Sequence, residues 1–156
     1  MLTGMYTTSI GMGHHIVTGN QPYGLPLDLA TLPQYLAVAG YKAVMLGKWH
    51  LGHFKHAHLP LQRGFDAHVG FYSGFQDHFS HVSESSICEV ADAEGQCFLD
   101  LRSGTEALDT SSWDDELAYG PALWMAAFDD AVARVARGSG DASEGKPLFV
   151  CVGPNG

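Results

Sequence analysis

The sequence predicts an α/β fold with a mostly parallel sheet flanked by helices, and two pairs of segments support this prediction. An amphipathic segment at residues 31–40 is followed at once by an apolar run at 41–46. A longer amphipathic segment at 121–137 precedes a second apolar run at 148–152. Two apolar runs separated by a long excursion that contains a helix are typical of parallel strands joined by right-handed crossovers.

The first helix is predicted to begin after Thr31, which is a common capping residue, and to end at Gly40. The run Tyr41–Leu46 then fits a strand that is buried on both faces and stops at Gly47. The predicted apolar face of the helix consists of Leu32, Tyr35, Leu36 and Ala39.

The second helix is predicted to begin near Pro121 and to end before Gly138, with an ion pair between Asp130 and Arg134. The strand that follows contains Cys151, which is expected to behave as a small buried hydrophobe. Residues 52–112 show no sustained period and are predicted to form loops with short elements. The apolar face of the second helix consists of Trp124, Phe128, Ala131, Val132 and Val135.

Length and composition indicate one packed globular unit or part of one, because 46% of the 156 residues are hydrophobic. The formal net charge of -9 argues against nucleic acid or an anionic membrane surface as a partner. No apolar run is long enough to span a membrane, and the first residues lack the features of a secretory signal peptide.

Lys48 and His50 are the first candidate site residues, because they lie two and four residues past Leu46. Ligands of open parallel sheets collect beyond the carboxyl ends of the strands. A lysine there supplies a positive charge for a sulfate or phosphate ester, and a histidine transfers protons near neutral pH. The alternative is that Lys48 is a surface lysine and His50 a hydrogen-bonded structural histidine.

Four histidines at positions 50, 53, 56 and 58 raise the possibility of a transition-metal site. No cysteine pair or glutamate accompanies them at helical spacing, and Pro60 disfavours the helix that would bring them together. Exposed loop histidines are therefore the preferred interpretation, and no metal ligand is predicted in this sequence.

Two further features allow two interpretations each. Asp66 can cap a turn or orient a basic group, and the cap is preferred. Cys88 and Cys97 flank a short acidic loop, and their spacing fits either a small disulfide loop or two free thiols.

The segment from Gly40 to Gly52, which contains Gly47-Lys48-Trp49-His50-Leu51-Gly52, resembles the second signature of the type I sulfatases. The resemblance is strongest to the arylsulfatase B group. It extends through nearly the whole chain, at Leu2–Gly4, Leu25–Asp28, Thr31–Pro33, Leu59–Pro60, Arg63–Asp66, Asp77–His81, Asp100–Gly104 and Lys146–Phe149.

The resemblance implies a partial alkaline-phosphatase-like α/β fold and the hydrolysis of sulfate esters by a formylglycine nucleophile. It implies that Lys48 binds and stabilises the sulfate and that His50 is a general base. It also implies a lysosomal or secreted protein that acts on a sulfated carbohydrate or an aryl sulfate. Cys88 and Cys97 resemble a pair that the arylsulfatase B group keeps, which favours the disulfide.

The sequence also departs from the family pattern. The C-x-P-x-R motif that supplies the formylglycine precedes the Leu2–Gly4 segment in the family and does not occur here, nor do the calcium ligands that the family implies. Residues 1–156 are therefore expected to be part of an N-terminal catalytic domain that releases no product by itself. The alternatives are a non-catalytic sulfatase-like binding module and a histidine-rich metal-binding protein.

Overall fold

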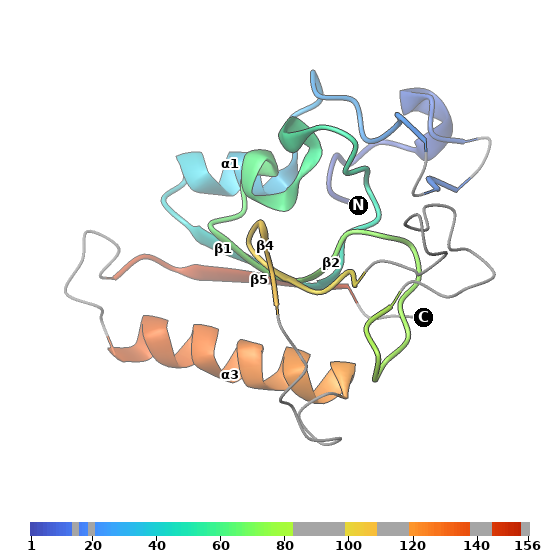
Figure 1. Ribbon diagram of the computed structural model, residues 1–156. Helices are drawn as coiled ribbons and strands as arrows, with labels where there is room; N and C mark the ends of the chain where they lie inside the picture. Colours follow the sequence, from blue (N-terminus) through green and yellow to red (C-terminus); the bar gives the residue numbers. More distant parts are fainter. Residues whose placement is uncertain (14–15, 19–20, 83–98, 109–118, 138–144, 154–156) are drawn as a thin grey trace.

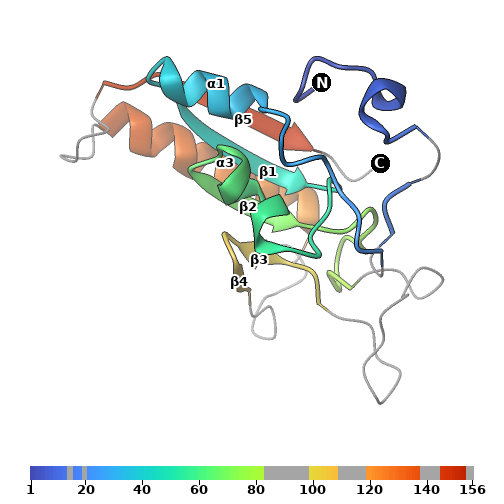
Figure 2. The ribbon, with the colours of Figure 1, turned by 90° about the horizontal axis from the view of Figure 1, so that it is seen from above.

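A computed structural model describes residues 1–13, 16–18, 21–82, 99–108, 119–137 and 145–153. Five strands form one sheet in the order β4-β3-β2-β1-β5. Helix α1 (Leu32–Val38) covers one face of this sheet and helix α3 (Gly120–Arg137) covers the other (Figure 1). Seen from above, the strands lie side by side and α3 passes behind them (Figure 2). The predicted flanked sheet is thus confirmed.

Strand β1 (Lys42–Lys48) lies at the centre of the parallel part of the sheet. It pairs in parallel with β2 (Ala67–Phe71) on one side and with β5 (Leu148–Gly153) on the other. Two short strands, β3 (Arg102–Ser103) and β4 (Glu106–Ala107), extend the sheet in antiparallel orientation beyond β2. The sheet is therefore mixed, with a parallel part that brings the carboxyl ends of three strands to one edge.

Two details of the predicted strands are wrong. Strand β1 does not stop at Gly47 but continues to Lys48, with Gly47 at a φ of 82°. Strand β5 is half-buried instead of buried on both faces, because it has a neighbour on only one side in the described sheet, and Val152 is 51% exposed. Cys151 on this strand is a half-buried free thiol, and burial raises the pKa of that thiol.

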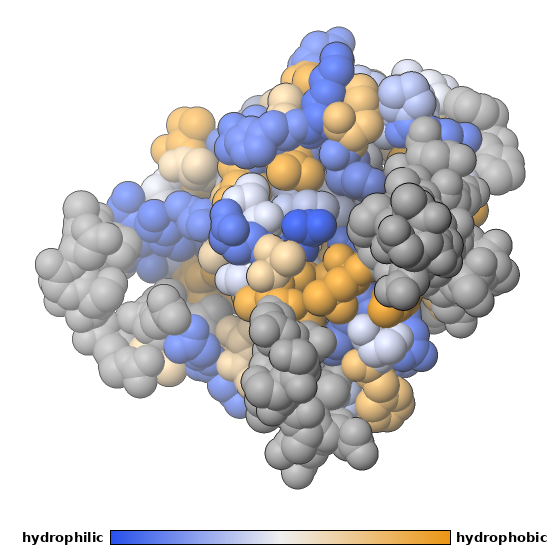
Figure 3. Space-filling model, viewed as in Figure 1, coloured by the Kyte–Doolittle hydropathy of each residue, from blue (hydrophilic) through white to orange (hydrophobic). Residues whose placement is uncertain are grey.

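Helix α1 forms where predicted, but its predicted apolar face is wrong. Pro33 is buried, whereas Leu32 is 41% and Tyr35 66% exposed. The Thr31 hydroxyl donates a hydrogen bond to the carbonyl oxygen of Arg63 at 2.6 Å, and this tether turns the Pro33 side of the helix inward. Apolar side chains consequently reach the surface over α1 (Figure 3).

Helix α3 confirms the second predicted helix and begins at Gly120. Trp124 is buried against Phe71 of β2, with ring centroids 6.3 Å apart, whereas Phe128 is 36% exposed. The side chains of the remaining predicted face residues and of Arg134 lie outside the described part of the structure.

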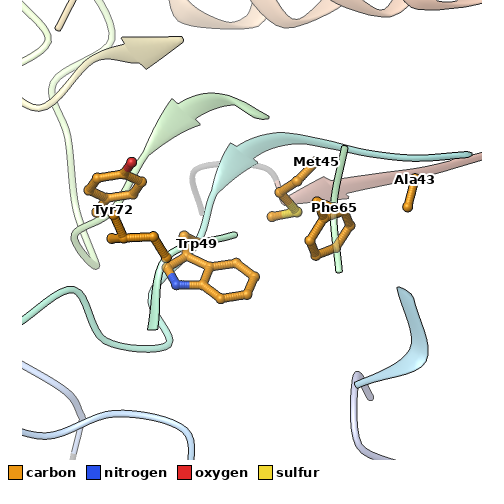
Figure 4. Packing of buried hydrophobic residues seen from close by; sticks show 6 residues of the cluster. Ala43, Met45, Trp49, Phe65 and Tyr72 are labelled. Atoms are coloured by element: carbon orange, nitrogen blue, oxygen red, sulfur yellow. The ribbon is translucent and has the colours of Figure 1, made fainter. Parts of the chain in front are cut away.

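Alternate side chains of β1, those of Ala43 and Met45, belong to one core, as expected for a strand with a period of two. Ala43 and Met45 pack with Leu59, Phe65 and other residues on the α1 side of the sheet (Figure 4). Trp49 and Phe65 meet edge to face, with centroids 6.0 Å apart. The second core, on the α3 side, consists of Phe71, Leu101 and Trp124.

The region predicted as loops with short elements contains β2, which was not expected as a strand. It also contains three-residue and four-residue 3-10 turns at His56–His58 and Pro60–Arg63; a third 3-10 turn lies near the N-terminus at Thr7–Ile10. An antiparallel bridge between Val82 and Leu99 brings the two ends of segment 83–98 together. None of the described helices is both long and apolar enough to cross a membrane.

Candidate active site

Lys48 and His50 lie at the edge of the sheet where the three parallel strands end. Lys48 is the last residue of β1, and His50 follows two residues later. Both side chains are half-buried. The positive charge of Lys48 is one of the causes that lower the pKa of His50, after burial. The strand-end placement expected from the sequence is thus observed.

The backbone beyond β1 remains attached to the backbone beyond β2. The Trp49 amide donates to the carbonyl oxygen of Phe71 at 2.9 Å, and the His50 amide donates to that of Tyr72 at 3.2 Å. His50 itself has a φ of 52°, a left-handed conformation that is uncommon for a residue other than glycine. The position of His50 therefore depends on the segment that follows β2.

The imidazole of His50 contacts the N-terminal segment of the chain. Its Nε2 atom lies 2.8 Å from the carbonyl oxygen of Val17. A carbonyl oxygen only accepts hydrogen bonds, so Nε2 carries the hydrogen in this contact and Nδ1 is the basic nitrogen of the neutral ring. Neither Val17 nor this choice of nitrogen had a signal in the sequence.

The surroundings of His50 favour its neutral form. Burial lowers the pKa of His50 most, the Val17 carbonyl opposes this, and the nearby charges of Lys48 and His53 lower the pKa further. A pKa below 6.5 leaves the ring uncharged at neutral pH, as a proton acceptor requires.

Gly74 lies directly against the His50 ring. A Cβ atom on Gly74 would stand 2.6 Å from Nε2 and 2.7 Å from Cε1 of His50, so only glycine fits there without moving the ring. The turn that contains Gly74 is held by Asp100. The Asp100 carboxylate accepts hydrogen bonds from the amides of Tyr72, at 3.1 Å to each oxygen, and of Ser73, at 2.8 Å. Sequence reasoning did not single out Asp100.

A stack of rings surrounds Tyr72 beside this turn. His68 stacks on Tyr72 with centroids 5.5 Å apart, and His53 stacks on it at 6.3 Å. The guanidinium of Arg102 lies 5.3 Å from the same ring. Burial lowers the pKa of His68 to about 4, which keeps this ring neutral within the stack.

Three of the four histidines at positions 50, 53, 56 and 58 are engaged in other contacts, and His56 is exposed. His50 bonds to Val17, His53 stacks on Tyr72, and His58 packs on Phe54 with centroids 4.6 Å apart. In the described part of the chain, no group of three or more histidine, cysteine or acidic side chains could hold a metal ion. The structure gives no support to the histidine-rich metal-binding interpretation.

The described carboxylates near the sheet do not fit the calcium site that the resemblance implies. Asp100 holds backbone amides, and Asp77 accepts hydrogen bonds from the amides of Phe79 and Ser80. Asp66 pairs with the Lys42 ammonium at 2.8 Å and accepts a hydrogen bond from the Ala43 amide at 2.8 Å. Asp66 thus orients a basic group, which was the less favoured of its two interpretations. No residue of the described chain is assigned to calcium.

Cys88 and Cys97 lie outside the described residues. Their disulfide stays a prediction.

Comparisons with known proteins identify the family of this chain. The profile of the Sulfatase family matches residues 1–156. Arylsulfatase J of Mus musculus is 39% identical over 113 residues, which cover 72% of this chain and 17% of that protein. N-acetylgalactosamine-6-sulfatase of Homo sapiens is 39% identical over 67 residues, or 43% of this chain and 13% of that protein. The chain therefore spans only a small part of the length of these relatives.

Solved structures show the same fold. The crystal structure of Ps i-CgsB superposes with a TM-score of 0.68 at 22% identity, over 96% of this chain and 31% of that one. The structure of Ps i-CgsB in complex with k-i-k-neocarrahexaose gives a TM-score of 0.69 at 24% identity, over the same shares of the two chains. The partial alkaline-phosphatase-like fold is confirmed, and because the family profile covers every residue, this chain belongs to the sulfatase family.

Proposed function

We propose that the protein carrying this chain hydrolyses sulfate esters at the site around Lys48 and His50. The observation that supports this most is the position of both residues at the carboxyl end of β1, in a chain that the sulfatase profile matches throughout. That end of a parallel strand is where α/β enzymes bind and transform ligands.

The two side chains have complementary roles. The Lys48 ammonium binds the negatively charged sulfate oxygens and stabilises the charge that develops on them during transfer. His50 accepts a proton at Nδ1, because Nε2 donates to the Val17 carbonyl. Burial lowers the pKa of His50, which favours the neutral ring that can accept a proton.

The nucleophile and the metal are not assigned within this chain. The sequence contains no C-x-P-x-R motif, and the described carboxylates do not form a calcium site. Both are expected from the family resemblance. We expect residues 1–156 alone to release no product.

The substrate class is a sulfate ester of a carbohydrate or an aryl alcohol. A carbohydrate ester is supported by the similarity to a protein named N-acetylgalactosamine-6-sulfatase. A lysosomal or secreted location is proposed on the same resemblance. The finer placement in the arylsulfatase B group remains a prediction.

The test is whether the protein encoded by the longest open reading frame that contains this chain hydrolyses 4-methylumbelliferyl sulfate. Lys48→Ala is expected to lower kcat by about 100-fold to 1,000-fold, as removal of one transition-state donor does. His50→Asn is expected to lower kcat by about 100-fold or more. Asparagine is chosen because it tolerates the left-handed backbone at this position.

Lys55→Ala is the matched control, because Lys55 is an exposed lysine that lies over the Phe54 ring. It should retain full activity. Equal activities of the Lys48 and Lys55 variants would contradict the proposed site. Sulfate binding that depends on Lys48 without any turnover would instead identify a non-catalytic binding module.

A further inference from the structure

We propose that Asp100 is a positioning residue, which holds the imidazole of His50 in place through the turn formed by Tyr72, Ser73 and Gly74. The inference rests on the proposed function only in taking His50 as the reacting group. The physical link between Asp100 and His50 stands on contacts alone.

The first part of the link is the anchor of the turn. Asp100 accepts the amide hydrogens of two successive residues, Tyr72 and Ser73, with N···O distances of 3.1 Å and 2.8 Å. The Asp100 side chain is only 14% exposed, so these charge-assisted hydrogen bonds are shielded from water. Without the carboxylate, both amides would lose their partner.

The second part of the link joins the turn to His50. The carbonyl oxygen of Tyr72 accepts the His50 amide hydrogen at 3.2 Å, which fixes the backbone of His50. Gly74 touches the ring itself, since a Cβ on Gly74 would lie 2.6 Å from His50 Nε2. The turn thus determines both the backbone and one side of the imidazole, whose Nε2 reaches the Val17 carbonyl.

The third part is the fixation of Asp100. Its amide donates to the carbonyl oxygen of His81 at 3.0 Å, and its own carbonyl oxygen accepts from Gln76 Nε2 at 2.9 Å. Gln76 Nε2 also donates to the carbonyl oxygen of His81 at 3.2 Å, and Gln76 is only 3% exposed. Arg102 Nε lies 3.8 Å from the carboxylate. Asp100 is therefore held by contacts of its own, and its carboxylate in turn holds the amides of Tyr72 and Ser73.

Asp77 provides a matched control within the same stretch of chain. Its carboxylate also accepts two successive amide hydrogens, from Phe79 at 3.1 Å and Ser80 at 2.7 Å. The Asp77 carbonyl oxygen accepts a hydrogen bond from the amide of His81, and Asp77→Ala keeps this backbone contact. Asp77→Ala therefore removes the same kind of side-chain anchor as Asp100→Ala and removes no hydrogen bond of the proposed link.

The experiment records the His50 ring by long-range ¹H–¹⁵N NMR during a pH titration of the full 156-residue chain. In the wild type, His50 should show the Nε2–H form. In Asp100→Ala, we expect the pKa of His50 to rise, because a released turn exposes the ring and weakens the burial that lowers this pKa. The neighbouring charges of Lys48 and His53 are the same in every variant. Asp77→Ala should leave the His50 titration unchanged.

The direction of the shift separates positioning from charge. Loss of a negative charge alone would lower the pKa of His50 or leave it unchanged, and either result in folded Asp100→Ala overturns the proposal. An equal rise in Asp77→Ala overturns it as well. If Asp100→Ala does not fold, Asp100→Asn is the second variant, because its side-chain amide oxygen replaces only one of the two carboxylate oxygens that hold the turn. The same rise in the pKa of His50 is expected, and the same results overturn the proposal. All these readings are independent of turnover, so a failure of the proposed hydrolysis is distinguishable from a failure of this link.

Discussion

Gly47 and Gly153 lie opposite each other in β1 and β5, and a Cβ atom on Gly47 would collide with the carbonyl oxygen of Gly153. Gly47 also has a φ of 82°, where a side chain costs about 1–2 kcal/mol by itself. Gly70 of β2 pairs with Gly47 from the other side. A Cβ atom on Gly70 would collide with the carbonyl oxygen of Gly47. Three adjacent strands thus approach one another at glycines immediately before Lys48.

The first prediction concerns Gly47→Ala. We expect a loss of about 3 kcal/mol or more in the free energy of unfolding, because a backbone collision adds to the cost of the left-handed conformation. Gly40→Ala is the control, since Gly40 has a φ of 85° with no atom within 4 Å of its would-be Cβ. Gly40→Ala should lower the free energy of unfolding by only about 1 kcal/mol. Similar urea midpoints for the two variants would show that the strands do not approach this closely.

The second prediction is a loss of stability on acidification. The unfolded chain binds a proton at His68 near pH 6.5, whereas the folded chain binds it only near pH 4. The unfolded state therefore holds more protons between these values, and stability falls as the pH falls through this window, by about 3 kcal/mol from His68. The lowered pKa of His50 acts in the same direction.

Urea unfolding at pH 7 and pH 4.5 tests this dependence. His68→Gln should make the difference between the two midpoints smaller, because it removes the buried titrating ring. His56→Gln, at an exposed histidine, should leave that difference as it is in the wild type. An unchanged difference in His68→Gln would refute the assignment.

The third prediction separates the two contacts of Asp66. The side chains of Lys42 and Asp66 are 36% and 40% exposed, so their ion pair contributes at most about 1 kcal/mol and Lys42→Met should cost no more than that. Asp66→Ala also leaves the Ala43 amide without its acceptor and should cost about 1–3 kcal/mol. Urea titrations of both variants check this order. A larger loss in Lys42→Met than in Asp66→Ala would contradict it.

The fourth prediction concerns the cysteines. With Cys88 and Cys97 in a disulfide, the unfolded chain should take one maleimide label, on Cys151, and three labels after reduction, as read by intact mass. In the folded chain Cys151 should react slowly, because it is half-buried and its thiol pKa is raised. Three labels without reduction would show that the disulfide does not form.

The elements predicted correctly are those with a sustained local pattern. α1, β1, α3 and β5 each carry a period or an apolar run that is bounded by turn residues. β2 was missed because His68 and Gly70 are unusual in strands. The fold accommodates His68 through the ring of Tyr72, and it requires a glycine at 70 because the backbone of β1 passes so close. These reasons exist only in the assembled sheet.

The same distinction holds for the site. Lys48 and His50 could be found because their spacing from a strand end is local in sequence. Val17, which contacts His50, lies 33 residues before it in the sequence. Asp100, which holds Tyr72, lies 28 residues after it. Val17 contributes a single carbonyl group with no local motif, and Asp100 lies in a segment of the family resemblance to which no role had been assigned. Contacts of this kind appear only when the segments are placed in space.

The bridge between Val82 and Leu99 has a consequence for how this region can change in evolution. Gln76 fixes the chain on both sides of the bridge, at His81 and at Asp100, so the two stems of segment 83–98 are held by residues outside it. Sequence changes confined to segment 83–98 are therefore expected to leave the turn beside His50 in place, because the contacts that hold this turn come from residues outside the segment.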